Sequence, residues 1–125
     1  MRYRIFNKIN EKVSLLGMGA MRLPETADGE VDEKEAIDII MSSVDSGVNY
    51  VDTAYNYHGG KSEVIVGKAL KDGYRQKVLL ADKMPIWMAK DETKMKEIFD
   101  TQLERLDVDC IDMYLSLIHI SEPTR

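Results

Sequence analysis

The chain has 125 residues, of which 44% are hydrophobic and 31% charged, and its formal net charge is −5 at pH 7. This composition is typical of a globular protein that forms one modest domain or part of a larger one. The acidic balance argues against nucleic-acid or anionic-membrane partners, and because no stretch is long enough to span a membrane and no signal core is present, we expect a cytoplasmic protein.

The first two predicted elements form a small hairpin. Residues 2–6 and 11–13 read as short strands joined across residues 7–10. Residues 14–23 follow as a continuous apolar run broken by two glycines, which predicts the first strand of the main fold.

A helix is predicted to begin after Asp32. The Asp32 side chain can cap the helix, and Glu35 stands three residues later, where it can complete a capping box. Gly47 is placed to end this helix. The apolar residues that recur on one helical face are Ala36, Ile37, Ile40, Met41 and Val44.

The next unit repeats the order of strand and helix. Residues 48–53 are rich in β-branched and aromatic side chains and predict a second strand. Ser62 is a good N-cap for a helix that runs to about Leu70 and is terminated by Gly73. Residues 77–83 predict a third strand.

A third helix and a fourth strand complete the pattern. The helix is expected from about residue 91 to residue 106, and the strand over residues 110–115. Cys110, the only cysteine, is expected to be a buried apolar residue of that strand in a reduced compartment, and no metal site is expected because no Cys/His cluster has ligand spacing. The residues expected to point inward from the helix are Met95, Ile98, Phe99, Leu103 and Leu106.

This alternation predicts parallel strands joined by right-handed crossovers, covered on both faces. Both a doubly wound sheet and a (β/α)8 barrel fit it. Residues 17–22 lack the third glycine of a dinucleotide-binding fingerprint, which favours the barrel. We therefore expect an α/β fold that is part of a (β/α)8 barrel, with an N-terminal hairpin and roughly the first four strands and three helices.

Three polar residues follow or end the predicted strands. Asp52 ends the second strand, Tyr57 lies just beyond it, and Lys83 ends the third strand. Because the carboxyl ends of neighbouring parallel strands meet at one edge, these side chains are expected to converge there.

Such a trio suits the reduction of a carbonyl group. A free tyrosine ionises only near pH ~10, too high for efficient proton donation at neutrality. A neighbouring lysine ammonium favours the phenolate, and an aspartate holds the lysine charged and oriented. We therefore predict Tyr57 as general acid, Lys83 as the group that tunes it, and Asp52 as the residue that orients Lys83.

Four segments together resemble the aldo-keto reductase family. Residues 47–57 resemble the signature around its catalytic aspartate and tyrosine, and residues 62–70 the helix that follows. Residues 78–83 resemble the strand with the catalytic lysine, and residues 102–115 the lead-in to the catalytic histidine. The similarity runs from about residue 2 to residue 115, in the family's order.

The resemblance implies a TIM barrel, NADP(H) as hydride carrier, and a small aldehyde or ketone as substrate. Gly19, Met21 and Asp52 lie where family members approach the cofactor. His58 and Trp87 are the candidate contacts to the substrate, from the loops beyond Tyr57 and Lys83.

Residues 57–63 and 83–87 resemble a bacterial branch whose longer members carry a C-terminal ferredoxin-like domain, so a [4Fe-4S] cluster is possible in a further domain. Because the resemblance to the family runs to residue 115, residues 1–115 are expected to be the N-terminal part of an NADP-dependent oxidoreductase barrel.

The end of the sequence departs from the family. Family members continue with leucine and then the catalytic histidine where this chain has Ser116 and Leu117, and His119 comes two residues late. The last residues also read, codon by codon, as a translated sequencing-library adapter. Residues 116–125 are thus expected to be a non-native tail, with the catalytic histidine lost at the truncation and the chain as written inactive.

Two other functions fit the same barrel. One is a protein that keeps the cofactor but acts by binding partners rather than by catalysis. The other is an unrelated barrel enzyme, such as an isomerase, which would bind no nicotinamide. The sequence leaves the carbonyl substrate, the preference for NADPH over NADH, and the oligomeric state open.

Overall fold

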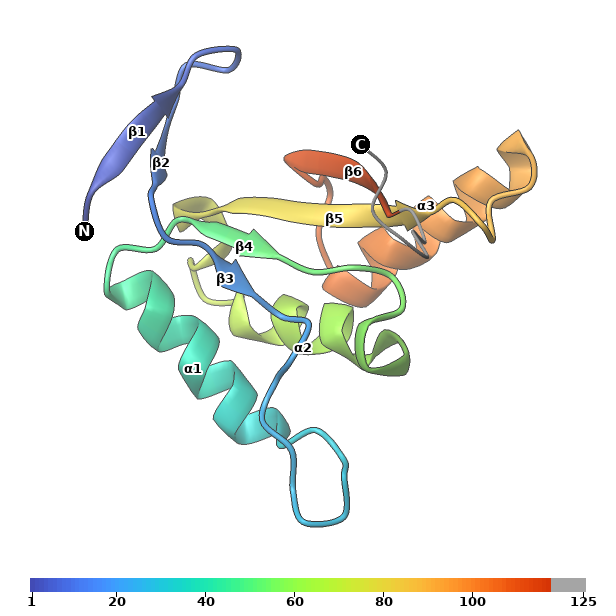
Figure 1. The fold of residues 1–125 in the computed structure, drawn as a ribbon, viewed down its shortest axis with the longest axis horizontal. Coiled ribbons are helices and arrows are strands. Elements are labelled where there is room, and N and C mark those ends of the chain that lie inside the picture. Colours follow the sequence, from blue (N-terminus) through green and yellow to red (C-terminus); the bar gives the residue numbers. More distant parts are fainter. Residues whose placement is uncertain (118–125) are drawn as a thin grey trace, which may run out of the picture.

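The computed structural model describes residues 1–117. It begins with the predicted hairpin, in which β1 (Tyr3–Phe6) pairs with β2 (Glu11–Ser14) in antiparallel register. Asn10 in the connecting turn has a positive φ of 54°, a conformation that asparagine tolerates better than most residues. The hairpin stands apart from the rest of the molecule (Figure 1).

The main sheet has four strands in the order β3-β4-β5-β6, and every neighbouring pair is parallel. Its strands are β3 (Met18–Gly19), β4 (Tyr50–Asp52), β5 (Leu79–Pro85) and β6 (Met113–Leu117). Strand order follows chain order, so each right-handed crossover advances the sheet in the same direction. This arrangement is that of a partial barrel, and it excludes the reversal of strand order that defines a doubly wound sheet.

Three α-helices connect the strands: α1 (Glu33–Asp45), α2 (Lys61–Ala69) and α3 (Glu92–Leu106). Short 3-10 turns precede β5 and α2, at η2 (Arg75–Lys77) and η1 (Tyr57–Gly60). Figure 1 shows α1 and α2 along one side of the sheet, with α3 continuing that layer beside β5. Among the described residues, the helices therefore lie on one face of the sheet (Figure 1), as in a (β/α)8 barrel.

Helix α1 largely follows its sequence pattern. Asp32 accepts a hydrogen bond from the Glu35 backbone N–H at 3.1 Å, as a capping residue does. The predicted capping box is only half formed, because the Asp32 N–H donates instead to Pro24 O. Gly47 follows the helix with φ 101°, where a side chain would be strained. Of the predicted apolar face, Ala36, Ile40 and Val44 are buried, and Ile37 and Met41 are half-buried.

The start of α2 differs from the prediction. Ser62 is not the N-cap, because the helix already begins at Lys61. Gly60 takes the capping position with φ 95°, which only glycine adopts without strain. The Ser62 side chain faces inward instead, where it is free to form the contacts described below.

Helix α3 begins as expected, with Asp91 capping the Lys94 N–H at 2.8 Å. Ile98 and Leu106 are buried and Phe99 and Leu103 half-buried, but Met95 is exposed because the first turns of α3 extend beyond the sheet.

The boundaries of the first and last strands were also predicted imperfectly. Of the expected 14–23 strand, only Met18 and Gly19 pair in the main sheet, and β6 begins three residues later than expected. Cys110 therefore precedes β6 and is exposed, so its prediction as a buried strand residue is wrong. Strand β6 includes Ser116 and Leu117, the first two residues of the expected tail. Residues 118–125, with His119, lie outside the described residues.

The hydrophobic core lies between the sheet and the helices. Val51 of β4 and Leu80 of β5 pack with Ile40 of α1, Val66 of α2 and Leu106 of α3, and all five are fully buried. A second, smaller cluster joins β5 to α3 and consists of Met84, Ala89 and Ile98. Leu80 and Met84 thus define the face of β5 that meets the helices, and Lys83, one residue before Met84, lies on the opposite face.

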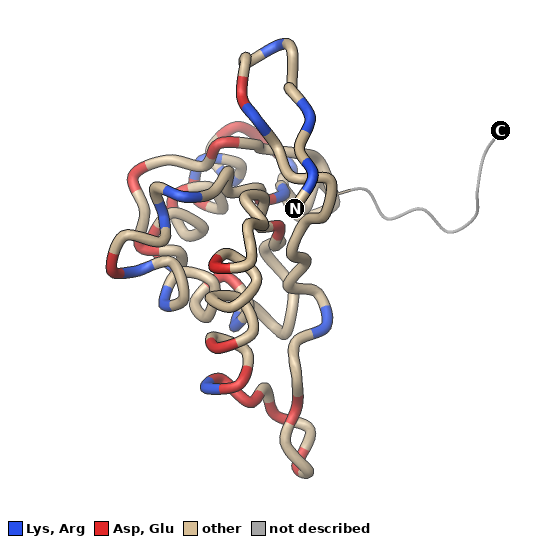
Figure 2. The backbone as a smooth tube through the Cα atoms, turned by 90° about the vertical axis from the view of Figure 1, so that its left-hand side faces the viewer, with Lys and Arg blue, Asp and Glu red and all other residues tan. Residues whose placement is uncertain are grey.

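Charged residues of both signs are distributed along the chain, including the protruding hairpin (Figure 2). Within residues 1–117, no helix is long and apolar enough to cross a membrane. Nor does that part of the chain bring together three His, Cys, Asp or Glu side chains that could hold a metal ion.

Candidate active site

Asp52 and Lys83 meet as predicted, at the carboxyl ends of neighbouring strands. Lys83 Nζ lies 2.5 Å from Asp52 Oδ1 and also donates to Thr53 O at 2.8 Å. The Lys83 side chain is 15% exposed and that of Asp52 is 29% exposed, so water screens their attraction less than that of a surface ion pair. One detail of the prediction is wrong: Lys83 does not end its strand, because β5 continues to Pro85, and Lys83 pairs in register with Leu115.

Tyr57 lies next to this ion pair. It is the first residue of η1, and its N–H donates to Ala54 O at 3.2 Å. The Lys83 ammonium sits 5.1 Å from the centre of the Tyr57 ring, within the range of a cation–π contact. The fold therefore brings together the three residues that were predicted as a catalytic trio.

Buried hydroxyl groups hold the loops beneath the trio. Ser62 Oγ donates to Ala20 O at 2.9 Å, and Thr53 Oγ1 lies 2.8 Å from Ser62 Oγ. Ala20 N in turn donates to Asp52 O at 2.8 Å. The loops beyond β3 and β4 are thus tied to the first turn of α2, which fixes the backbone on both sides of Asp52.

Two other tyrosines lie near the trio but have different surroundings. Burial and the charge of Asp52 raise the pKa of Tyr50 above its usual value, so its hydroxyl stays protonated. Tyr55 packs under Arg105, whose guanidinium carbon lies 4.5 Å from the ring centre. Neither tyrosine replaces Tyr57 beside Lys83.

The predicted cofactor residues Gly19 and Met21 lie at the same edge of the sheet. Gly19 pairs in register with Asp52, and among residues 1–117 no atom lies within 4 Å of the position that a Cβ would take. Met21 is 57% exposed and lines one shallow pocket together with His58. Contact of Gly19, Met21 or Asp52 with a cofactor stays a prediction.

The two predicted substrate contacts differ in their surroundings. His58 Nε2 accepts a hydrogen bond from Leu23 N at 3.0 Å, so this side chain anchors the loop after β3. Trp87 lies on the turn after β5 and is 43% exposed. Contact of either residue with a substrate stays a prediction.

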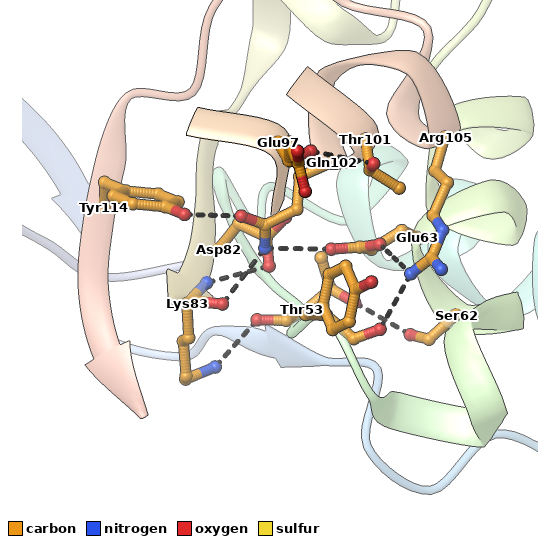
Figure 3. Close-up of polar contacts among 11 residues, drawn as sticks. Thr53, Ser62, Glu63, Asp82, Lys83, Glu97, Thr101, Gln102, Arg105 and Tyr114 are labelled. Atoms are coloured by element: carbon orange, nitrogen blue, oxygen red, sulfur yellow. Dashed lines mark hydrogen bonds and ion pairs between the residues drawn. The ribbon is translucent and has the colours of Figure 1, made fainter. Parts of the chain in front are cut away.

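A buried polar network behind the trio was not predicted. Asp82, Glu63 and Gln102 are fully buried, and their neighbours Arg105 and Tyr114 are bonded to them (Figure 3). The available sequence signal was Asp82 itself, because it stands between Leu80 and Met84 on the apolar face of a strand. Glu63, Gln102 and Arg105 gave no signal, since each is a polar residue on a helix that also has an exposed face, and Tyr114 is a partly exposed residue of β6.

The sequence is similar to a known family and to known proteins. The model of the Aldo/keto reductase family matches residues 15–125. The chain is 34% identical to aldo-keto reductase YhdN of Bacillus subtilis, an alignment that covers 98% of this chain and 39% of that protein.

Solved structures give the same result. An aldo-keto reductase from Klebsiella pneumoniae in complex with NADPH has a TM-score of 0.80 and 27% identity, over 98% of this chain and 42% of that one. A second Klebsiella pneumoniae aldo/keto reductase, in complex with NADP and acetate, has a TM-score of 0.75 and 30% identity, over 86% of this chain and 36% of that one. The chain thus spans about two fifths of the length of these relatives.

Proposed function

Because this chain belongs to the aldo/keto reductase family, we propose that the whole protein reduces an aldehyde or ketone with hydride from NADPH, and that Asp52, Tyr57 and Lys83 act at the reacting carbonyl. The observation that carries the proposal is the partly buried Asp52–Lys83 ion pair beside the Tyr57 ring. Complexes of structural neighbours with NADP and NADPH support the choice of cofactor.

Each member of the trio has a distinct role in this proposal. Asp52 keeps the Lys83 ammonium in place, and the carbonyl of Thr53 accepts a second bond from the same group. Tyr57, whose ring lies beside the Lys83 ammonium, is the proton donor to the carbonyl oxygen. Bound NADPH would supply the hydride, and Gly19, Met21 and Asp52 are the residues that would hold it at this edge of the sheet.

The test is steady-state reduction of a panel of small aldehydes and ketones by the whole protein. Tyr57→Phe and Lys83→Met are expected to lower kcat about 10²–10⁴-fold, because each removes proton-transfer chemistry. Their Kd for NADPH, measured by fluorescence titration, is expected to stay near the wild-type value.

Lys77→Met is the matched control. The Lys77 ammonium also lies over a tyrosine ring, 4.6 Å from the centre of Tyr74, but away from the trio. Full activity of the Tyr57 or Lys83 variant would overturn the catalytic assignment. A wild-type protein that binds NADPH but reduces no carbonyl would favour the non-catalytic, partner-binding alternative.

A further inference from the structure

The backbone of Lys83 is held from the side of the sheet opposite to its ammonium group. Its N–H donates to Asp82 Oδ1 at 2.8 Å, and its carbonyl oxygen accepts from Gln102 Nε2 at 3.0 Å. Both Asp82 and Gln102 are fully buried. The polar groups on either side of the Lys83 Cα are therefore fixed by side chains that no solvent reaches.

Gln102 itself is fixed by two further partners. Its Nε2 also donates to Glu63 Oε1 at 3.0 Å, and its Oε1 accepts from the Tyr114 hydroxyl at 2.5 Å. Glu63 Oε2 forms an ion pair with Arg105 at 3.0 Å. Side chains from α2, α3 and β6 thus converge behind Lys83 on β5 (Figure 3). A carboxamide is the group that matches this site, since the site requires two donated hydrogens and one accepting oxygen.

Protonation completes the network. Among the described residues, Asp82 Oδ2 has no hydrogen-bond donor as its partner. Burial, and then the hydrogen bond to Glu63 and its charge, raise the pKa of Asp82 to about 8. Near neutral pH Asp82 therefore holds a proton that it can donate to Glu63. Burial and the two carboxyl groups also raise the pKa of Tyr114, so its hydroxyl remains a donor.

Fold stability alone does not explain these buried polar groups. Leu80 and Met84 occupy the equivalent positions on the same face of β5, and well-packed apolar residues are often at least as stabilising as a buried polar network. Small displacements of a reacting group are costly, since a shift of about 1 Å can lower a rate about a hundredfold. The network lies where it controls one such group.

We propose that Gln102 is a positioning residue for Lys83: its amide, oriented by Glu63 and Tyr114, holds the Lys83 carbonyl so that the ammonium stays between Asp52 and the Tyr57 ring. This inference rests on the proposed function, because it assigns to Gln102 a role in the geometry of the catalytic lysine. Gln102 touches neither substrate nor cofactor in this account.

Gln102→Met in the whole protein tests the proposal. Methionine keeps the length of the side chain but provides no N–H donor. We expect kcat to fall on the order of tenfold to a hundredfold. The KM for the carbonyl and the Kd for NADPH should stay within about twofold, because binding surfaces are untouched. Tyr114→Phe removes the bond that Gln102 Oε1 accepts, but it leaves the two bonds that Gln102 Nε2 donates to Lys83 and Glu63. The kcat of this variant should therefore change by less than about threefold.

Ile98→Val is the control that distinguishes a general loss of packing from a loss of Lys83 positioning. Ile98 is a fully buried residue of the same helix. This variant lowers stability by about 0.5–1.5 kcal/mol without touching Lys83, and its kcat should equal that of the wild type. Wild-type kcat in a folded Gln102→Met variant would overturn the proposal. So would a loss of kcat in Ile98→Val as large as that in Gln102→Met.

Crystal structures of the wild type and of Gln102→Met give a readout that needs no activity. We expect Lys83 Nζ to leave its position 2.5 Å from Asp52 Oδ1 in the variant. If the wild type reduces no carbonyl but Lys83 still moves, the proposed function fails and the positioning role stands. An unmoved Lys83 overturns the positioning role whatever the activity of the wild type.

Discussion

Asp82 and Lys83 are adjacent in sequence but serve opposite faces of β5. Lys83 points toward Asp52 and Tyr57, whereas Asp82 is buried with Glu63 and Gln102 beneath the helices. Strand geometry alone produces this separation, because successive side chains alternate between the two faces of a sheet. Two charged residues in succession thus belong to two different environments, one partly exposed beside Asp52 and one closed to water.

The buried carboxyl group of Asp82 gives a pH dependence that can be measured. Its pKa is about 8 in the folded protein and near 3.8 when exposed, so between these values the folded state holds a proton that the unfolded state has lost. The free energy of unfolding is therefore expected to fall as pH rises from about 4 to about 8. Asp82→Asn keeps a donor toward Glu63 and an acceptor for Lys83 N but does not titrate, so its stability should depend less on pH.

The measurement is the free energy of unfolding of the wild type and of Asp82→Asn, obtained by chemical denaturation of the whole protein at several pH values. Glu63 from α2 is the titratable group that faces Asp82, and the charge of Lys83 acts on it from the other face of the same strand. Arg105 is paired with Glu63, and Tyr114 is bonded to Gln102. Parallel pH profiles for the two proteins would show that Asp82 is ionised in the folded state.

At the scale of the elements, helices α2 and α3 are held unusually close by Gly67. A Cβ at this position would lie 2.4 Å from Leu106 O, closer than real contacts allow. The same contact places the Glu63 side of α2 against α3, where Gln102 and Arg105 meet it. A small residue in the middle of α2 is therefore a condition for the network behind Lys83.

Gly67→Ala is expected to destabilise the protein by about 1–3 kcal/mol, because the backbone of α3 must move to make room. Helix propensity alone predicts the opposite sign, since alanine is favoured over glycine by about 1 kcal/mol. Thermal unfolding of the whole protein decides between them. Val64→Ala, an exposed position on the same helix, is the control and should change stability by less than about 0.5 kcal/mol. A higher Tm for Gly67→Ala would contradict the contact.

At the scale of the whole molecule, the inner face of the sheet and its edge strand are open. Tyr114 and Leu115 of β6 and Phe6 and Leu15 near the hairpin are exposed apolar residues, and they line one groove. In a barrel of this family about 250 residues close the sheet, whereas this chain matches about two fifths of its relatives. An open apolar edge strand is a template for association.

Residues 1–125 expressed alone are expected to unfold gradually at low denaturant, to self-associate and to reduce no carbonyl. Circular dichroism during denaturation, size-exclusion chromatography and an NADPH oxidation assay measure these three properties. A sharp cooperative transition of a monomer would show that the partial barrel is a stable unit by itself.

Local signals in the sequence predicted much of the fold. The hairpin, the Asp32 cap and the glycine that ends α1 depend on residues within a few positions of one another, and the structure confirms them. The convergence of Asp52, Tyr57 and Lys83 was also predictable, because parallel strands deliver their carboxyl ends to one edge. Their chemical roles stay predictions until the variants are measured.

What the sequence determined by itself was the order of elements, the edge of the sheet where polar residues gather, and the family to which the chain belongs. Only the tertiary structure decided that Gly60 rather than Ser62 caps α2, that Lys83 lies within its strand, and that Cys110 is exposed. It also decided which side chains meet behind Lys83. Hydrophobic periodicity shows that a helix has a buried face, but the partners of a buried polar group on that face depend on which helices pack against which strand.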